Sequence, residues 1–410
     1  MKKDYDVIRK TCRLNSEISA DLIDTKLIYY ADLKENLGKE ITKKLKKYQH
    51  ITSDWPDSHI NFIISQLIAH RIFKENGLIH KYIHHAFVKS LSADQQSFLK
   101  IQQKIAWRYT FSKVIANPAQ DFYEMEDVFS EENYLLYSPG INKSLKEVNP
   151  NMWLLLIGSN GECWQSSGLN IPLVNINPDD VFYFSTELSD YIEDESDIIN
   201  DLNTNPIPYL MMLDLGISPR LHHKKHQLSY WSSSNGPLDI KFDVTTLKSK
   251  FFTAWNDHVY ELKLKRYSSF PHFAVAYYDE NRQMIFRYAL TEAGFIKLSE
   301  ALINAGFPLF KEADVHLSMP MHQLLESILE RKVVMNPYED LFATNADKLD
   351  DEEAEDSDDI VALRRFMDIA VTKFNNNENV DVDAIVKQVG ADPNFASKIW
   401  NNFKNKMDQI

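Results

Sequence analysis

Cysteine is nearly absent from this sequence. Cys12 and Cys163 are the only two among 410 residues. Two cysteines cannot build a disulfide-rich scaffold, and they cannot supply a zinc module with four thiolate ligands. Because low cysteine usage is typical of proteins from reducing compartments, we expect a cytoplasmic protein.

Long apolar runs are also missing. No stretch of about 18 apolar residues occurs, so no transmembrane helix is predicted. The most apolar segments, such as MWLLLIG at 152–158, are only of strand length. The first residues carry two lysines but no apolar core, and this favours a helix over a signal peptide. No association with a membrane is therefore expected.

Several sequence motifs of common enzymes are lacking. The segment GSNGEC at 158–163 follows an apolar run. It has neither the GK[ST] of a phosphate-binding loop nor the GxGxxG of a dinucleotide fold. There is no GxSxG nucleophile elbow and no internal repeat. No cofactor is predicted on these grounds.

What the chain does contain is enough apolar material for more than one core. Hydrophobic residues make up 44% of the sequence, and its length favours two or three domains. Helical periodicity dominates up to Pro118, including one helix predicted from Ser92 to Asn117. Short strand-like runs follow, with a hairpin signal at Asn160–Gly161 and a helix beginning near Asn177. This order predicts an α+β fold.

Four parts are predicted along the chain. They are a basic helical region at 1–118, an acidic α+β body at 119–347, an acidic flexible linker at 348–359, and a small helical module at 360–410. The linker contains DDEEAEDSDD, with eight carboxylates in ten residues, whose mutual repulsion opposes folding. The module should hold three helices, at 360–374, 381–389 and 393–407, with a partial match to a helix-turn-helix.

Charge is distributed unevenly between these parts. The whole chain carries a net charge of −14, but residues 1–118 carry 20 basic against 12 acidic residues, a net of +8. Such asymmetry is expected of a basic module for an anionic partner. It is equally expected if the basic and acidic parts dock on each other, or if both are simply solvated.

A lysine-rich helix is the first candidate site. In GKEITKKLKKYQH at 38–50, Lys39, Lys43, Lys46 and Lys47 can share one face and contact phosphates without sequence preference. The same stripe is typical of a solvated amphipathic helix. In the C-terminal module, Lys398 and Lys404 belong to a second candidate nucleic-acid surface.

An E-x-K tripeptide is the second candidate. Glu261 and Lys263 alternate on one face of a predicted strand. Metal-dependent nucleases need such a pair together with an upstream acid, here Asp239, Asp243 or Asp257, to hold Mg²⁺ and position the attacking water. The alternative is an ordinary strand whose polar face is exposed to solvent.

Histidine pairs are the third candidate. His80 and His84 are four residues apart on a predicted helix, and His222 and His226 have the same spacing if residues 220–228 are helical. The two pairs together could ligate a metal. Lysines stand where zinc hydrolases of the H-E-x-x-H type carry their glutamate, and this disfavours a metal site. The alternative is that LHHKKH at 221–226 is a pH-sensitive docking point for the acidic segment 350–359.

The sequence therefore predicts a non-catalytic intracellular adaptor or regulatory protein that binds a protein or a nucleic acid. A small module on a flexible linker raises the local concentration of whatever it holds, which favours binding over catalysis. The alternatives are a metal-dependent nuclease or other hydrolase and a histidine-mediated metal-binding protein. The oligomeric state is left open.

Overall fold

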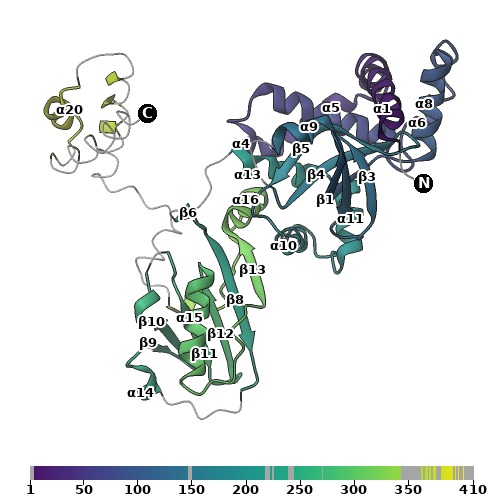
Figure 1. Ribbon diagram of the computed structural model, residues 1–410. Helices are drawn as coiled ribbons and strands as arrows, with labels where there is room; N and C mark the ends of the chain where they lie inside the picture. The colour runs from purple at the N-terminus through teal and green to yellow at the C-terminus, as the bar shows by residue number, and fades with distance from the viewer. Residues whose placement is uncertain are drawn as a thin grey trace. The chain divides into compact units, whose positions relative to one another are not determined.

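The computed structural model describes residues 4–145, 150–217, 222–223, 226–238, 244–269, 271–342, 362, 365–367, 369–370, 373–374, 380–390, 393, 396 and 400. The chain forms two units, Met1–Asn336 and Pro337–Ile410. Helices at the N-terminus precede a body with a closed barrel and a six-stranded antiparallel sheet (Figure 1). This arrangement confirms the predicted α+β class.

Helices make up most of the first hundred residues. They are α1 (Tyr5–Ser19), the π-helix η1 (Ala20–Leu27), α2 (Ile28–Glu35), α3 (Leu37–Leu45), η2 (Lys46–Tyr48), α4 (Gln49–Thr52), α5 (Asp57–Phe73), α6 (Ile79–Tyr82), α7 (Ala86–Lys89) and α8 (Ala93–Lys104). Ser92 caps α8 through a capping box with Gln95, in which each side chain satisfies a backbone N–H. No helix among the described residues is both long enough and apolar enough to cross a lipid bilayer.

A closed five-stranded barrel follows. Its strands are β1 (Arg108–Ala119), β2 (Phe122–Asp127), β3 (Asn133–Tyr137), β4 (Met152–Ser159) and β5 (Trp164–Leu173), with α9 (Pro139–Ser144) between β3 and β4. The strand order is β1-β2-β3-β5-β4, and β3 pairs with β5 in parallel while all other pairs are antiparallel. This is a Greek-key barrel with the strand order of an OB-fold.

The helix predicted from Ser92 to Asn117 is wrong in its second half. Helix α8 ends at Lys104, and β1 begins at Arg108. The segment RYTFSKVIA is rich in aromatic and β-branched residues, which favour a pleated strand. Its pairing with β2 shifts register between Val114 and Ala119, so Pro118 is tolerated where the ladder is irregular. The hairpin predicted at Asn160–Gly161 is confirmed, because it joins the antiparallel β4 and β5.

Helix α1 covers the outer face of β2 and β3. Its buried residues Ile8 and Cys12 form a small cluster with Phe122, Leu135, Tyr137 and Cys163. The barrel interior holds a different set, because side chains alternate between the two faces of a strand. OB-folds bind ligands on the face of strands 2 and 3 and on the β4–β5 loop. In this chain that surface is packed against α1.

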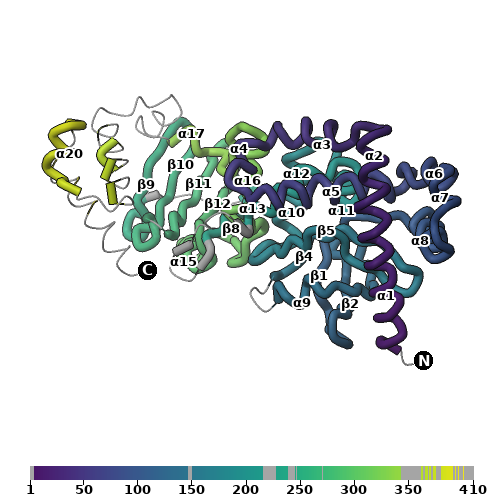
Figure 2. Tube along the Cα trace, turned by 90° about the horizontal axis from the view of Figure 1, so that it is seen from above, coloured from purple at the N-terminus to yellow at the C-terminus, as the bar shows by residue number. Residues whose placement is uncertain are grey.

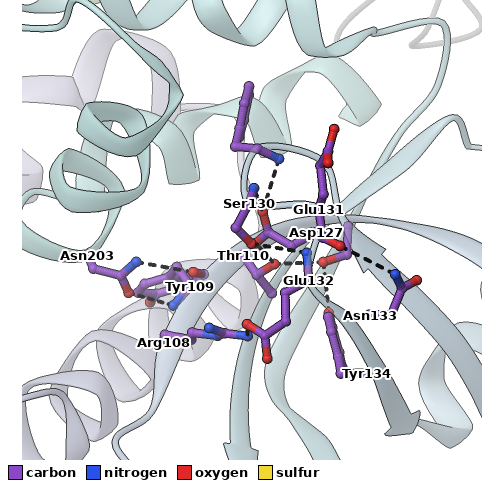
Figure 3. Close-up of polar contacts among 12 residues, drawn as sticks. Arg108, Tyr109, Thr110, Asp127, Ser130, Glu131, Glu132, Asn133, Tyr134 and Asn203 are labelled. Carbon is purple, nitrogen blue, oxygen red and sulfur yellow. Dashed lines mark hydrogen bonds and ion pairs between the residues drawn. The ribbon is translucent and has the colours of Figure 1, made fainter.

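The turn between β2 and β3 is fixed by a buried carboxylate, as Figure 3 shows. Asp127 Oδ1 accepts hydrogen bonds from the backbone N–H of Phe129 (3.0 Å) and Ser130 (2.9 Å), and Oδ2 accepts from Thr110 Oγ1 (2.5 Å). Arg108 and Glu132 form an ion pair at 2.5 Å beside it. A buried carboxylate that satisfies three donors orders a turn at little desolvation cost.

The N-terminal helices share one large core with the barrel. Residues of α5, including Ile63 and Leu67, lie in the same cluster as Leu154 and Leu156 of β4. Helices α2, α3 and α5 pack side by side on this core (Figure 2). Further helices complete the cover. They are α10 (Pro178–Leu188), α11 (Glu195–Thr204), α12 (Ile207–Leu210), η3 (Met211–Leu213) and α13 (Asp214–Ile217).

A six-stranded antiparallel sheet forms the second core, in the order β13-β8-β12-β11-β10-β9. The strands are β8 (Ser229–Asn235), β9 (Phe251–Asn256), β10 (Val259–Leu264), β11 (Val275–Asp279), β12 (Met284–Ala289) and β13 (Val315–Ser318). Helix α15 (Glu292–Ile303) packs Phe295, Leu298 and Leu302 on one face of the sheet. Two short helices, α14 (Val244–Leu247) and η4 (Lys265–Tyr267), stand before β9 and after β10 in the sequence.

The sheet and the barrel region meet at α10 and α16 (Met319–Leu329). Asp180 of α10 is fully buried, caps its own helix and accepts a hydrogen bond from the Ser318 N–H. Burial raises the pKa of Asp180 to about 6, and its hydrogen bonds from Asn177 and Ser318 oppose that rise.

The second unit contains α17 (Glu339–Phe342) and α20 (Val382–Val389). Helix α20 matches the helix predicted at 381–389, with Asp381 as its cap and Gly390 in the left-handed conformation that ends it. The predicted linker 348–359 lies outside the described residues, as do parts of the other two predicted helices. The predicted boundaries of the four parts remain predictions.

Candidate anion-binding site

Helix α3 presents lysines to solvent because its apolar residues are used on the opposite side. Leu37, Ile41 and Leu45 are buried against the core. Lys39 and Lys43 of α3, and the following Lys46 and Lys47 of η2, are exposed. At about 100° per residue, Lys43 and Lys47 lie on the side of the helix next to Lys44. The four lysines predicted to contact phosphate therefore belong to a surface that continues toward Lys44.

A cavity of about 180 Å³ lies between α3, α5 and the turn that joins α11 to α12. Its charged wall is formed by Lys44 from α3 and by Arg71 and Lys74 from α5, and Glu40 is its one acidic lining residue. Apolar side chains, among them Leu67 and Ile207, complete the wall. A concave site lined by charges of one sign concentrates ions of the opposite sign.

The positive charge of this wall is only partly compensated. Lys44 pairs with Glu40 at 2.8 Å, and this contact lowers the pKa of Glu40. Within the described part of the chain, neither Arg71 nor Lys74 has an acidic partner at ion-pair distance. The pKa of Lys74 is lowered, first by burial and then by repulsion from Arg71 and Lys44. An anion in the cavity would relieve that repulsion.

One histidine in this wall stays uncharged. His70 is buried, and its Nε2 has no hydrogen-bond partner among the described residues. Desolvation by burial, with repulsion from Lys74 second, lowers the pKa of His70 to about 3, although a hydrogen bond with Asn203 opposes the shift. Its ring packs on Tyr109 with the ring centroids 4.7 Å apart. At neutral pH the cationic groups of the wall are therefore Lys44, Arg71 and Lys74.

Asn203 holds this wall to the barrel. Its Oδ1 accepts a hydrogen bond from the Tyr109 N–H at 2.7 Å, and its Nδ2 donates to the Tyr109 carbonyl at 3.2 Å (Figure 3). The same Nδ2 donates to the carbonyl of Ile199 at 2.9 Å within α11. The side chain thus acts as an extra rung between β1 and α11. The turn after α11 that borders the cavity is positioned by this contact.

The sequence reasoning missed Arg71, Lys74 and Lys44 as site residues. Arg71 and Lys74 lie three apart in an otherwise apolar helix, so their spacing alone indicates only an exposed edge. What unites them with Lys44 is the packing of α5 on α3, which no local pattern reports. The other two predicted binding residues, Lys398 and Lys404, lie outside the described residues.

The E-x-K pair is placed differently from the expectation of an exposed face. Glu261 is buried on β10, and its Oε2 lies 3.0 Å from Lys263 Nζ. Tyr277 donates a hydrogen bond to Glu261 Oε1 at 3.3 Å. The carboxylate is therefore engaged by a neutral donor and a lysine, as in a structural pair. The upstream acids Asp239 and Asp243 lie outside the described residues, so the nuclease interpretation stays a prediction.

The two predicted histidine pairs lie on different kinds of secondary structure. His80 and His84 are exposed near α6, and His80 Nδ1 lies 3.4 Å from Gln103 Nε2. His222 falls in the two-residue strand β6 (His222–His223) and His226 in β7 (His226–Gln227), so the helical condition for this pair is not met. Within the described residues, no three acidic, histidine or cysteine side chains are arranged to hold a metal ion.

Comparison of the chain with protein-family models, with curated protein sequences and with solved structures found no match. The functional assignment therefore depends on the chemistry of the site itself.

Proposed function

We propose that the protein is a non-catalytic binding protein whose α3–α5 surface binds the phosphate backbone of a nucleic acid. The observation that carries the proposal is the convergence of Lys44, Arg71 and Lys74 on one cavity, next to the exposed lysines of α3. Arginine and lysine are the residues that recognise phosphate, arginine with two parallel hydrogen bonds and lysine as a point charge.

The charge of this surface supports a polyanion over a single small anion. Residues 37–48 and 70–75 together carry seven basic residues against Glu40 and Glu75. A run of lysines beside a cavity matches a ligand that carries several phosphates along a chain. Contacts of this kind position a nucleic acid without reading its sequence. We therefore expect binding that depends strongly on salt and weakly on sequence.

Fluorescence anisotropy with a labelled 20-nucleotide single strand tests the proposal. The double variant Arg71→Gln/Lys74→Gln removes two charges from the cavity wall and should weaken binding at least tenfold in low salt. The matched control Lys89→Gln/Lys100→Gln removes two exposed lysines on α7 and α8, outside the cavity wall. It lowers the net charge by the same amount.

The control separates local contacts from the mean charge of the protein. If both double variants weaken binding equally, the cavity is not the binding site. If the unaltered protein does not bind the oligonucleotide even in low salt, the nucleic-acid proposal is wrong and a protein ligand becomes the better candidate.

A further inference from the structure

The only two cysteines of the chain meet in space. Cys12 lies in the middle of α1 and Cys163 at the end of the β4–β5 loop, 151 residues later, and their Sγ atoms are 3.4 Å apart. Both side chains are buried, and both are free thiols in this structure. A disulfide bond brings two sulfurs to about 2.0 Å. The pair is thus within a small side-chain movement of bond formation.

The surroundings hold both sulfurs in place. Asn160 Nδ2 lies 3.3 Å from Cys12 Sγ and 3.6 Å from Cys163 Sγ as a donor to each. Asn160 Oδ1 in turn accepts from the backbone N–H of Glu162 and of Cys163, which fixes its orientation. Gln165 Nε2 donates to the Cys12 carbonyl at 3.0 Å and so ties α1 to β5.

The two thiols differ in acidity. The hydrogen bond between them lowers the pKa of Cys12, with Asn160 and the charge of Arg9 acting in the same direction and burial opposing them. The same contact, together with burial, raises the pKa of Cys163 far above its usual range. Cys12 is therefore the sulfur that loses its proton first. The thiolate is the reactive form of cysteine.

A polar cavity of about 260 Å³ lies next to the pair. Its wall comes from α1, the π-helix η1, α8 and the β4–β5 region, and it includes Asn160 and Gln165. Asn160 donates to the Cys12 sulfur and Gln165 to the Cys12 carbonyl, so the cavity is lined by two side chains that contact Cys12 directly. It is large enough to admit a small oxidant such as hydrogen peroxide, whose access the burial of both cysteines would otherwise restrict.

We propose that Cys12 and Cys163 are a reversible dithiol–disulfide site that locks α1 onto the β2–β3 face of the barrel. The Cys12 thiolate attacks one oxygen of hydrogen peroxide, the O–O bond breaks, and the departing hydroxide takes up a proton to leave as water. The resulting sulfenic acid is attacked by Cys163, whose proton goes to the second departing hydroxide. Two thiols and one peroxide thus give one disulfide and two waters, and a dithiol reductant reverses the change.

The structural consequence follows from what α1 covers. The helix is held on Phe122, Leu135 and Tyr137 by few buried side chains, with the Arg9 guanidinium 5.5 Å from the ring centre of Phe122. So small a contact can open locally while the rest of the unit stays folded. The disulfide would keep this face closed, and reduction would allow α1 to leave it.

Peptide mass spectrometry tests the bond in the full-length protein. The protein is reduced, treated with one to five equivalents of hydrogen peroxide, alkylated in denaturant and digested. We expect loss of both thiols together and a cross-linked pair of peptides holding Cys12 and Cys163 within one chain. In Cys163→Ser, Cys12 should instead stop at a sulfenic acid that dimedone traps. Independent oxidation of the two thiols, or cross-links only between chains, would overturn the proposal.

Hydrogen exchange tests the lock. Oxidation should slow amide exchange in residues 5–19 at least tenfold, and a reductant should restore the original rate. Cys12→Ser and Cys163→Ser are matched controls in which the peroxide should leave that rate unchanged. If a serine variant does not fold, the oxidised and reduced forms of the unaltered protein still give the comparison. Equal exchange rates in those two forms would show that the bond does not hold α1.

Discussion

Acidification should destabilise this protein through His70. In the folded chain the pKa of His70 is about 3, whereas an unfolded histidine titrates near 6.5. As the pH falls below 6.5, His70 binds a proton in the unfolded chain but not in the folded chain. Stability is therefore lost progressively between pH 6.5 and about 3. pH 5 lies about 1.5 units below the pKa of an unfolded histidine. At that pH His70 alone therefore lowers the free energy of unfolding by about 2 kcal/mol.

Asp180 acts in the opposite direction over the same range. Its folded pKa of about 6 lies above the ordinary value for aspartate, so the folded chain binds a proton before the unfolded chain does. Stability from this group is present at low pH and is lost as the pH rises toward 6. When the pH falls from 7 to 5, Asp180 therefore raises the free energy of unfolding by about 1 kcal/mol. Of these two groups, His70 thus dominates the change.

Urea unfolding at pH 7 and pH 5 measures the effect. The substitution His70→Gln removes the titrating ring but keeps a polar side chain of similar size for Asn203. Any destabilisation caused by the substitution itself appears at both pH values. The comparison is therefore between the loss of unfolding free energy from pH 7 to pH 5 in the variant and in the unaltered protein. We expect the variant to lose about 2 kcal/mol less than the unaltered protein on acidification. Equal losses in the two proteins would refute the claim that His70 is held neutral.

Three further predictions concern stability. Gly158→Ala should destabilise the protein by about 3 kcal/mol or more in urea unfolding, because the new Cβ would lie 2.4 Å from Nε1 of the packed Trp107 ring; an unchanged midpoint would contradict this close approach. Arg287→Met should cost about 3 kcal/mol, because fully buried Arg287 donates hydrogen bonds to Ser233, Asn235, Ser299 and the Phe310 carbonyl that methionine cannot make. A thermal melt that shifts by less than 2 °C would refute this view of Arg287. Oxidising the cysteine pair should stabilise the first unit by up to about 5 kcal/mol, since the bond closes a loop of about 150 residues, and a higher urea midpoint without reductant would show it.

The fold class was predictable because periodicity is local. Apolar residues every three or four positions in α5, and the Asn160–Gly161 signal, report on their own immediate surroundings. The helix predicted for the segment after Trp107 was wrong because helix α8 is followed by β1 within four residues. Apolar side chains on both sides of that junction blurred the change from helical to alternating spacing. Here the preference of aromatic and β-branched residues for strands was the better guide.

The candidate sites were less predictable because they form across distant segments. Lysines 39, 43, 46 and 47 could be recognised as one helix face, but the cavity needs Arg71 and Lys74 from another helix. For Cys12 and Cys163 the sequence analysis could use only the cysteine count, because nothing local indicates that residues 151 positions apart will meet. Glu261 was expected to be exposed on the polar side of its strand. The hydrogen bond from Tyr277 and the pairing with Lys263 are what make its burial tolerable.

The most direct test of the proposed function is the salt dependence of oligonucleotide binding. For a single strand, the slope of log K against log salt concentration becomes shallower by about 0.7 for each phosphate contact that is lost. The account predicts that Arg71→Gln/Lys74→Gln reduces the slope by about 1.4, while Lys89→Gln/Lys100→Gln leaves it unchanged. Identical slopes for the unaltered protein and the cavity variant would contradict the assignment of Arg71 and Lys74 as phosphate contacts.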